Sequence, residues 1–496
     1  MAPKIIVLLS ILLLNCQLIF GQTLWCDYLI SHSSGYTCQL TIINPDGLNN
    51  FTHINGTHMA NMTNEDVASI TVSSMNSGSN SPNIPSIICE IFPNTTSSTL
   101  TRLGVKRIHD YSYKSCKHLT HIHVNHNNIT EVDENAFIEN TELQFLELWF
   151  NELPTLPENV FRNQQKLIRL RLDFNRITDL PDNIFVPLRN LTFWGMESNL
   201  IKDLKIKWFE NFERLETLWL FYNRIEELST NVFHPLINLK SLGLSFNMLS
   251  NLTTEMFEQF MNLEDLWLDI NELEDLPLNF FNSMTNLKEL DLGTNKLSNL
   301  RAEWFKPLSN LEYLGLYENE ISELSAEIFT PLQNLEFLTL EVNDIEDLPS
   351  NIFSSLINIE VIRLNANNLK IIHSDSFGVL PNFAYFTASN NQIDAFDEKL
   401  IDNSRISGID MMNNICANFG VFDYSDSRQL IRNGLQKCFE NYENLNPGCV
   451  GGNWDERVCL IEDKNQAQQE KIEHLQAAVE ELQKLVQELI DRPCRS

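Results

Sequence analysis

One spacing constrains the fold of this chain more than any other feature: an asparagine recurs at a constant interval through its middle, as from Asn127 to Asn151 to Asn175. The pattern around each one is LxxLxLxxNxIxxL, and from Asn127 to Asn367 a phenylalanine follows ten residues later. So regular a period predicts one small unit stacked on itself, because a single unit cannot bury its own apolar side chains. The recurring residues are Asn127, Asn151, Asn175, Asn199, Asn223, Asn247, Asn271, Asn295, Asn319, Asn343, Asn367 and Asn391, with Asn414 following at a slightly shorter interval.

The apolar positions of the repeat predict its core. In each LxL triplet the two leucines point to one side of a short strand, and the residue between them points to the other. Stacked units then form a parallel sheet on the inner face of a curved solenoid. We expect each asparagine amide to satisfy the backbone of a turn that recurs at every level. The phenylalanines predict a stacked spine near the convex side: Phe137, Phe161, Phe185, Phe209, Phe233, Phe257, Phe281, Phe305, Phe329, Phe353 and Phe377.

This repeat resembles the extracellular leucine-rich repeat family in its 24-residue form, across about residues 100–415. The resemblance implies an α/β solenoid, curved into a horseshoe with a parallel sheet on its concave face. Upstream of the first asparagine a degenerate unit fits the pattern, with leucine in place of asparagine. Its apolar residues are Leu100, Leu103, Val105, Ile108 and Tyr113.

The beginning of the chain predicts secretion. Residues 1–21 combine Lys4, an apolar run over 5–14 and a small residue at Gly21, which is the layout of a cleavable signal peptide. The run is too short to span a bilayer, and an uncleaved anchor is the alternative. Sequons for N-glycosylation fit the same route, at Asn50, Asn55, Asn61, Asn94, Asn128, Asn190 and Asn251.

Cysteines flank the repeats on both sides. A solenoid exposes an apolar cross-section at each end, so we expect an N-terminal cap at 22–99 and a C-terminal cap at 416–459, each stapled by disulfides. The spacing does not give the connectivity. The cysteines are Cys26, Cys38, Cys89 and Cys116 before the repeats, and Cys416, Cys438, Cys449 and Cys459 after them.

The tail, residues 460–496, predicts a coiled coil. β-Branched residues and leucines alternate at heptad spacing, which favours a parallel two-stranded coil. Cys494 follows the helix-ending Pro493, so two parallel chains would bring these cysteines together in an intermolecular disulfide. Packing of the tail onto the solenoid and a higher oligomer are the alternatives. The coil core comprises Ile472, Leu475, Val479, Leu482, Val486 and Leu489.

Three positions in each unit face the open concave side: six, four and two residues before the asparagine. Many carry aromatic side chains, which mark interfaces more than catalytic pockets. In LQFLELWFN at 143–151 we assign the leucines, Asn151 and Phe150 to the scaffold. The candidate binding residues are Phe145, Glu147, Trp149, Phe193, Trp219, Phe221, Asp265, Trp267, Asp269, Glu289, Asp291, Tyr313, Tyr317 and Phe337.

Two features of this surface suggest the kind of ligand. Gly243 lies between Trp219 and Trp267 on successive strands, which predicts a notch of about 10 Å for a side chain or a sugar ring. The acidic residues from Asp265 to Asp291 lie next to it and suit a basic partner. The alternative is that the aromatic rings simply cover one another. A net charge of −31 opposes binding to nucleic acid or to anionic membranes.

Catalytic signals are missing from the sequence. His121 and His123 share the concave face with Glu147, so a metal or pH-sensing site is one interpretation and an ordinary polar edge is the favoured one. No GxSxG, HExxH or phosphate-binding glycine loop occurs. We therefore expect no enzyme activity, no cofactor and no metal.

The order of signal peptide, repeats, cysteine cap and coil resembles that of secreted insect leucine-rich-repeat immune proteins. The resemblance implies a recognition or adaptor protein that binds a protein or glycan on its concave face. It also implies a homo- or heterodimer joined through the tail. The alternative is a circulating carrier or an extracellular-matrix structural protein.

Overall fold

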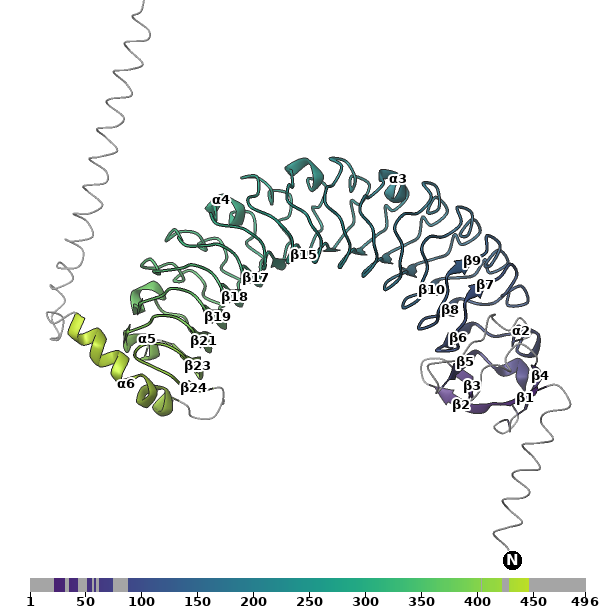
Figure 1. Cartoon of the computed structure of the whole chain (residues 1–496), viewed down its shortest axis with the longest axis horizontal. Coiled ribbons are helices and arrows are strands. Elements are labelled where there is room, and N and C mark those ends of the chain that lie inside the picture. Colours follow the sequence, from purple (N-terminus) through teal and green to yellow (C-terminus); the bar gives the residue numbers. More distant parts are fainter. Residues whose placement is uncertain are drawn as a thin grey trace, which may run out of the picture.

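The computed structural model describes residues 22–31, 35–42, 51–55, 58, 62–74, 88–402, 404–421 and 428–445. The chain forms a long arc with short strands along its inner side and turns and short helices along its outer side (Figure 1). The predicted curved solenoid is thereby confirmed. The signal peptide, the coiled-coil tail, three cysteines and two sequons lie outside the described residues: Cys449, Cys459, Cys494, Asn50 and Asn61.

The inner sheet is built from one short strand per repeat, and successive strands pair in parallel at equivalent positions of adjacent units. Leu146 pairs with Leu170, for example, so equivalent positions form rows across the sheet. The last parallel pair, where the interval is slightly shorter, joins Tyr385 to Gly408. The strands are β8 His121–His123, β10 Phe145–Glu147, β11 Arg169–Arg171, β12 Phe193–Gly195, β13 Thr217–Trp219, β14 Ser241–Gly243, β15 Asp265–Trp267, β16 Glu289–Asp291, β17 Tyr313–Gly315, β18 Phe337–Thr339, β19 Val361–Arg363, β21 Tyr385–Thr387 and β23 Gly408–Asp410.

The sheet continues into the N-terminal segment. Strands β3, β5 and β6 extend it in parallel from β8, and β2 closes this edge as an antiparallel hairpin with β3. Disulfides Cys26–Cys38 and Cys89–Cys116 tie this end together. The elements here are β1 Gln22–Trp25, β2 Asp27–Ser31, β3 Gly35–Ile42, β4 Phe51–Asn55, η2 Asn64–Asp66, β5 Ser69–Ser74, α2 Ile88–Ile91 and β6 Ser97–Thr101.

The C-terminal end is covered by a helix. Helix α6, Arg428–Leu445, packs on β22, where Phe439 meets Phe396 with 6.1 Å between ring centres. The Cys416–Cys438 disulfide joins this helix to the last repeat, so both predicted caps carry disulfides. The neighbouring elements are β22 Ala395–Phe396, α5 Lys399–Asp402 and β24 Gly420–Val421.

The outer side holds only short elements, which lets the units fan out. These are β7 Arg107–Ile108, β9 Glu131–Val132, α3 Ile206–Phe209, η3 Thr254–Met256, α4 Ala302–Phe305, β20 Ile371–Ile372 and η4 Ser374–Ser376. Beneath them the predicted phenylalanine spine is fully buried from Phe137 to Phe377. Phe305, Phe329 and Phe353, for instance, follow one another at 6.2 and 6.0 Å between ring centres. Burying one such ring contributes about 1.5–3 kcal/mol.

The asparagines form the predicted ladder. Asn247 donates from Nδ2 to the carbonyl oxygens of Leu220, Leu244 and Ser245, and its Oδ1 accepts from the amide of Ile225. The residue before each asparagine has a positive φ, as at Phe246 with 55°. Such a backbone is unfavourable for a bulky residue, so the asparagine bonds must hold the turn in place.

Candidate interaction surface

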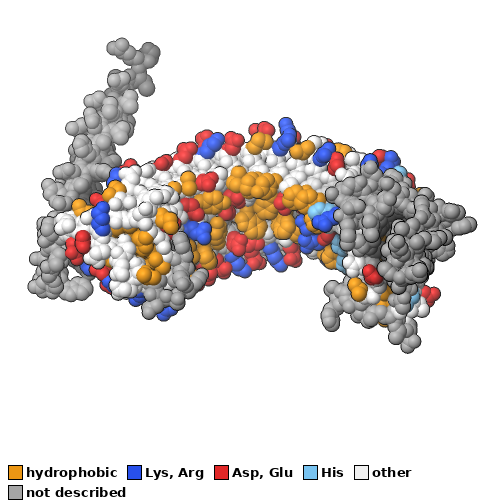
Figure 2. Space-filling model, turned by 60° about the horizontal axis from the view of Figure 1, so that its bottom comes forward, with side chains coloured by type: hydrophobic (Ala, Val, Ile, Leu, Met, Phe, Trp, Pro, Cys, Tyr) orange, Lys and Arg blue, Asp and Glu red, His pale blue; other side chains and the backbone are white. Residues whose placement is uncertain are grey.

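The middle of the concave face carries a continuous group of aromatic rings. Phe193, Trp219, Phe221 and Trp267 are all partly exposed, and we call them the aromatic band. Their ring centres are 4.8, 6.2 and 5.8 Å apart in that order, so each ring contacts the next. Figure 2 shows apolar side chains gathered on the inner face at the middle of the arc, with acidic side chains around them. The band brings together four of the predicted binding residues.

The predicted notch at Gly243 is wrong. A Cβ atom added there would lie 2.1 Å from Cζ of Phe221, so the phenylalanine ring already occupies the space between the two tryptophans. Gly293 and Gly315 behave alike: Tyr317 fills the space over the first and Asp291 the space over the second. Each of these glycines therefore accommodates a side chain from the neighbouring strand, and the concave face is flat where the notch was predicted.

Sequence reasoning missed a second row of rings, one member of which, Phe150, was assigned to the scaffold. Phe150 is 39% exposed, which contradicts its assignment to the core. It stacks between His126 and Phe174 at 4.6 and 4.1 Å. Two levels further, Tyr222 stacks on Phe246 at 3.7 Å. All five precede a ladder asparagine, and their positive φ turns them out along the edge of the sheet. The position before the asparagine could have revealed them, because a left-handed turn directs its side chain outward.

The N-terminal part of the concave face holds a network of paired charges. His121 stacks on Phe145 at 4.3 Å, and Glu147 pairs with His123 at 2.9 Å while accepting a hydrogen bond from Trp149. Burial lowers the pKa of His121. For Glu147, burial acts to raise the pKa, but the interaction with His123 acts against it, and the pKa lies below its ordinary value. In the described part of the chain no group of three or more His, Cys, Asp or Glu could hold a metal ion. These residues form a polar edge that is satisfied internally.

Further along, Arg171 and Asp173 extend that network. Arg171 Nε lies 2.7 Å from Asp173 Oδ2, and its guanidinium lies 5.0 Å from the Trp149 ring centre. Arg169 stacks on Phe193 at 3.8 Å. Burial raises the pKa of Asp173, and the charge of Arg171 opposes that rise. Asp173 and Glu147 therefore each lie within 4 Å of an arginine of the chain itself, Arg171 for the first and Arg169 for the second.

Among the described residues, the acidic side chains just beyond the aromatic band form no ion pair, although the charge of Lys288 acts on Asp265 from the flank. Asp269 and Asp291 are buried, Asp265 is half-buried and Glu289 is exposed. Burial is the main reason that the pKa values of Asp265 and Asp291 rise to about 6, and the neighbouring carboxylates Glu289 and Asp269 add to the rise. Burial raises the pKa of Asp269 as well. This acidic region thus carries negative charge that its surroundings disfavour.

Tyrosines and a phenylalanine border the acidic region on its far side. Tyr313 donates to Asp291 at 3.3 Å, and Tyr317 lies over Gly293. Phe337, on the next strand, is exposed. The predicted binding residues therefore fall into three groups along the sheet: a paired polar end, the aromatic band and an acidic region with tyrosines.

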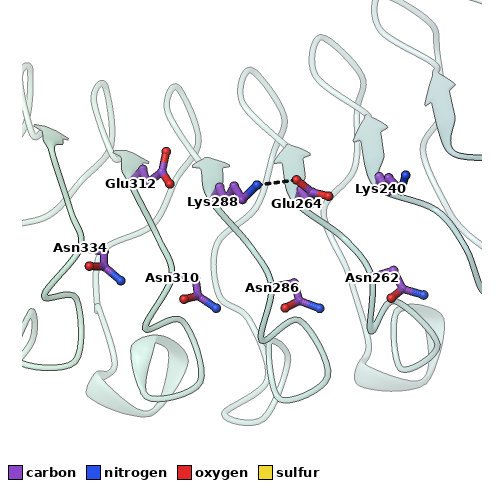
Figure 3. Close-up of a pocket in the computed structure, with 8 residues that line it drawn as sticks. All are labelled: Lys240, Asn262, Glu264, Asn286, Lys288, Asn310, Glu312 and Asn334. Atoms are coloured by element: carbon purple, nitrogen blue, oxygen red, sulfur yellow. Dashed lines mark hydrogen bonds and ion pairs between the residues drawn. The ribbon is translucent and has the colours of Figure 1, made fainter.

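A shallow groove of about 380 Å³ lies outside the concave face (Figure 3). Its polar groups are largely paired: Lys288 binds Glu264 at 2.7 Å. The asparagine Nδ2 atoms donate to carbonyl groups of the preceding unit, as Asn286 does to Met261 at 2.8 Å. The groove is lined by Lys240, Asn262, Glu264, Asn286, Lys288, Asn310, Glu312 and Asn334. We interpret it as a flank of the scaffold, where like residues bond between units.

Four sequons can be located relative to the concave face. Asn128 follows its ladder asparagine by one residue, Asn251 follows by four, and Asn190 precedes by nine, so none of the three stands in a concave row. Asn94 lies just before β6 and is exposed. Sugars at these positions would leave the aromatic band bare.

Comparison with known proteins decides the family. A leucine rich repeat model matches residues 195–249, 261–321 and 285–345, and a BspA type leucine rich repeat region model matches residues 83–216. The chain belongs to the leucine-rich repeat family. A comparison with curated protein sequences gave no match.

Solved structures show the same fold. A leucine-rich repeat protein of Leptospira interrogans is similar over 76% of this chain and 95% of its own, with 25% identity and a TM-score of 0.64. The APL1 leucine-rich repeat domain is similar over 84% and 92%, with 20% identity and a TM-score of 0.56. A chain of the Drosophila Toll–Spätzle complex is similar over 74% of this leucine-rich repeat protein but only 51% of its own length, with 18% identity and a TM-score of 0.51.

Proposed function

We propose that this leucine-rich repeat protein is a secreted, non-enzymatic recognition protein. It binds a protein or glycan partner on its concave face and acts in innate immunity. The observation that carries the proposal is the aromatic band, because large rings left partly exposed next to one another are typical of interfaces. The sequons support it, since their sugars would lie off this face. The fold supports it too, because Toll, which shares the fold, occurs in a complex with Spätzle.

Several observations bear on location and assembly. Three disulfides favour an oxidising compartment. No helix among the described residues is long and apolar enough to cross a membrane. The heptads and Cys494 in the tail support a dimer, which non-reducing electrophoresis tests directly. We expect a reducible dimer for the parent chain and a monomer band for Cys494→Ser; a monomer band for both would end this part of the proposal.

The concave-face proposal is tested by capture from the extracellular fluid of the producing cells. Parent protein and Lys288→Ala, a control on the flank groove, should retain the same partner. Trp219→Ala with Trp267→Ala should lose it while keeping its thermal unfolding midpoint within a few degrees. Equal capture by all three would refute concave-face binding. Constitutive capture of a hormone or a matrix fibre would favour the carrier or structural alternative.

A further inference from the structure

Two aspartates occupy the same position of the repeat, four units apart. Asp173 and Asp269 each stand two residues before a ladder asparagine, on the concave face, and both are buried. At the first, the residue two places earlier on the same strand is Arg171, which pairs with the carboxylate at 2.7 Å and lies over Trp149. At the second, the equivalent residue is Trp267. The carboxylate recurs at the second site, but an indole stands in the place of the guanidinium.

Only neutral groups satisfy the second site. Asp269 accepts a hydrogen bond from Ser245, and Asp291 on the next strand accepts from the Gly293 amide at 2.9 Å and from Tyr313. Within the described part of the chain, neither carboxylate forms an ion pair. The nearest arginine on the concave rows beyond them, Arg363, lies 3.9 Å from Glu341. A cation added here would meet two buried acids, where charges interact more strongly than in water.

The walls of the site suit a planar cation. Trp267 lies directly opposite Asp291 on the adjacent strand, on the side of the aromatic band, and Tyr317 covers Gly293 on the other side. Aromatic faces attract cations, and guanidinium stacks on them better than ammonium does. The same molecule uses this arrangement internally at Arg169 over Phe193 and at Arg171 over Trp149.

We propose that the acidic region beside the aromatic band binds an arginine side chain of a protein partner, and that an apolar side chain next to this arginine lies on the band. This rests on the proposed function and names its partner chemistry. The apolar contact extends over the sheet edge, where Tyr222 and Phe246 stack beside Phe221. Charge complementarity favours a basic protein segment over a neutral glycan, because a sugar would leave both carboxylates uncompensated.

The experiment uses a short synthetic peptide with one arginine between two leucines, and the same peptide with citrulline as the neutral control. Binding to the full-length protein is followed by fluorescence anisotropy at pH 7. The arginine peptide should bind at least about tenfold more tightly than the citrulline peptide. Equal affinity of the two peptides, or no measurable binding of either, overturns the proposal.

Variants locate the bound arginine. Asp269→Asn with Asp291→Asn should remove the preference for arginine. Trp267→Arg should do the same by supplying the missing cation internally, as Arg171 does. Asp173→Asn, the matched control at the paired site, should keep it. A preference that survives Asp269→Asn with Asp291→Asn overturns the assignment.

Failure of this inference can be told from failure of concave-face binding. If Asp269→Asn with Asp291→Asn still captures the extracellular partner but Trp219→Ala with Trp267→Ala does not, the concave face binds through its rings alone. If no concave variant alters capture, the proposed function itself falls. Thermal unfolding of each variant excludes loss of the fold as the cause.

Discussion

The two halves of the concave face differ in the groups that contact their buried acidic side chains. Towards the N-terminus, the buried Asp173 is paired with Arg171 of the chain itself, and the partly exposed Glu147 lies 2.9 Å from His123 and 3.9 Å from Arg169. Towards the C-terminus, Asp269 and Asp291 are also buried, though less completely than Asp173, and among the described residues their hydrogen-bond donors are hydroxyl and amide groups. Burying an unpaired charge costs stability, so a fold that retains it points to a cation supplied from outside. The buried acid of the first half therefore has an internal cation, and the second half is the part that we propose for a partner.

The largest expected effect comes from breaking the paired half. Arg171→Ala leaves Asp173, whose side chain is 0% exposed, without its cation. Removing one member of a buried pair costs about 3–5 kcal/mol, which thermal or urea unfolding measures. Arg363→Ala is the control, because its ion pair is long and half-exposed and contributes less than about 1 kcal/mol. Equal losses for the two variants would mean that the two halves are not distinct.

Gly243→Ala probes the flat part of the concave face between the halves. The new Cβ would collide with the ring of Phe221, which must then leave its place against Trp267. We expect a loss of about 1–3 kcal/mol and a shift in tryptophan fluorescence. Unchanged stability and emission would show that the space over Gly243 is open and that the notch exists after all.

Removing a charge from the acidic half should increase the stability of the fold, whereas breaking the paired half decreases it. In Asp291 the folded-state pKa, about 6, exceeds the ordinary value of 3.8. The folded protein therefore binds more protons between these two values, and the contribution of Asp291 to stability falls as pH rises through this window. Asp291→Asn should raise the free energy of unfolding at pH 7 by about 1–2 kcal/mol.

The pH dependence provides the control for that prediction. The gain from Asp291→Asn should shrink as the pH falls from about 6 and vanish below the ordinary pKa of 3.8, where the aspartate is neutral in both states. Urea unfolding of parent and variant over this range measures it. A loss of stability at pH 7, or a gain independent of pH, would show that Asp291 is compensated in the free protein.

The smallest effect concerns the exposed ring row. Phe150→Ala should cost less than about 1 kcal/mol, because the ring is 39% exposed and its ring neighbours, His126, Trp149 and Phe174, also lie at the surface. Phe161→Ala, in the spine, should cost about 3–5 kcal/mol. Similar losses of stability in the two variants would show that Phe150 belongs to the core.

Much of this architecture was predictable because it is periodic. The leucines, the asparagine ladder and the spine from Phe137 to Phe377 each recur at one spacing, so their burial follows from a single unit. The three concave rows followed from the alternation of a strand. Features that recur in every repeat could therefore be predicted from the sequence.

The errors arose where neighbouring units differ. Phe150 was placed in the core because the position is often apolar, but its positive φ turns the ring outward. The notch failed because Phe221 leans across to the next strand, and such a lean depends on the residues at both levels. The contrast between Asp173 and Asp269 likewise depends on one substitution, arginine against tryptophan, and on side-chain directions that only coordinates supply.

The central claim is that the acidic half of the concave face carries uncompensated charge that binds a cationic side chain. It is tested most directly by the affinity of the arginine peptide for the full-length protein between about pH 7.5 and pH 4.5. The pKa values of Asp265 and Asp291, about 6, predict an affinity that is constant at the upper end and falls at least about tenfold once the pH drops below 6. An affinity that does not change over this range would contradict the account.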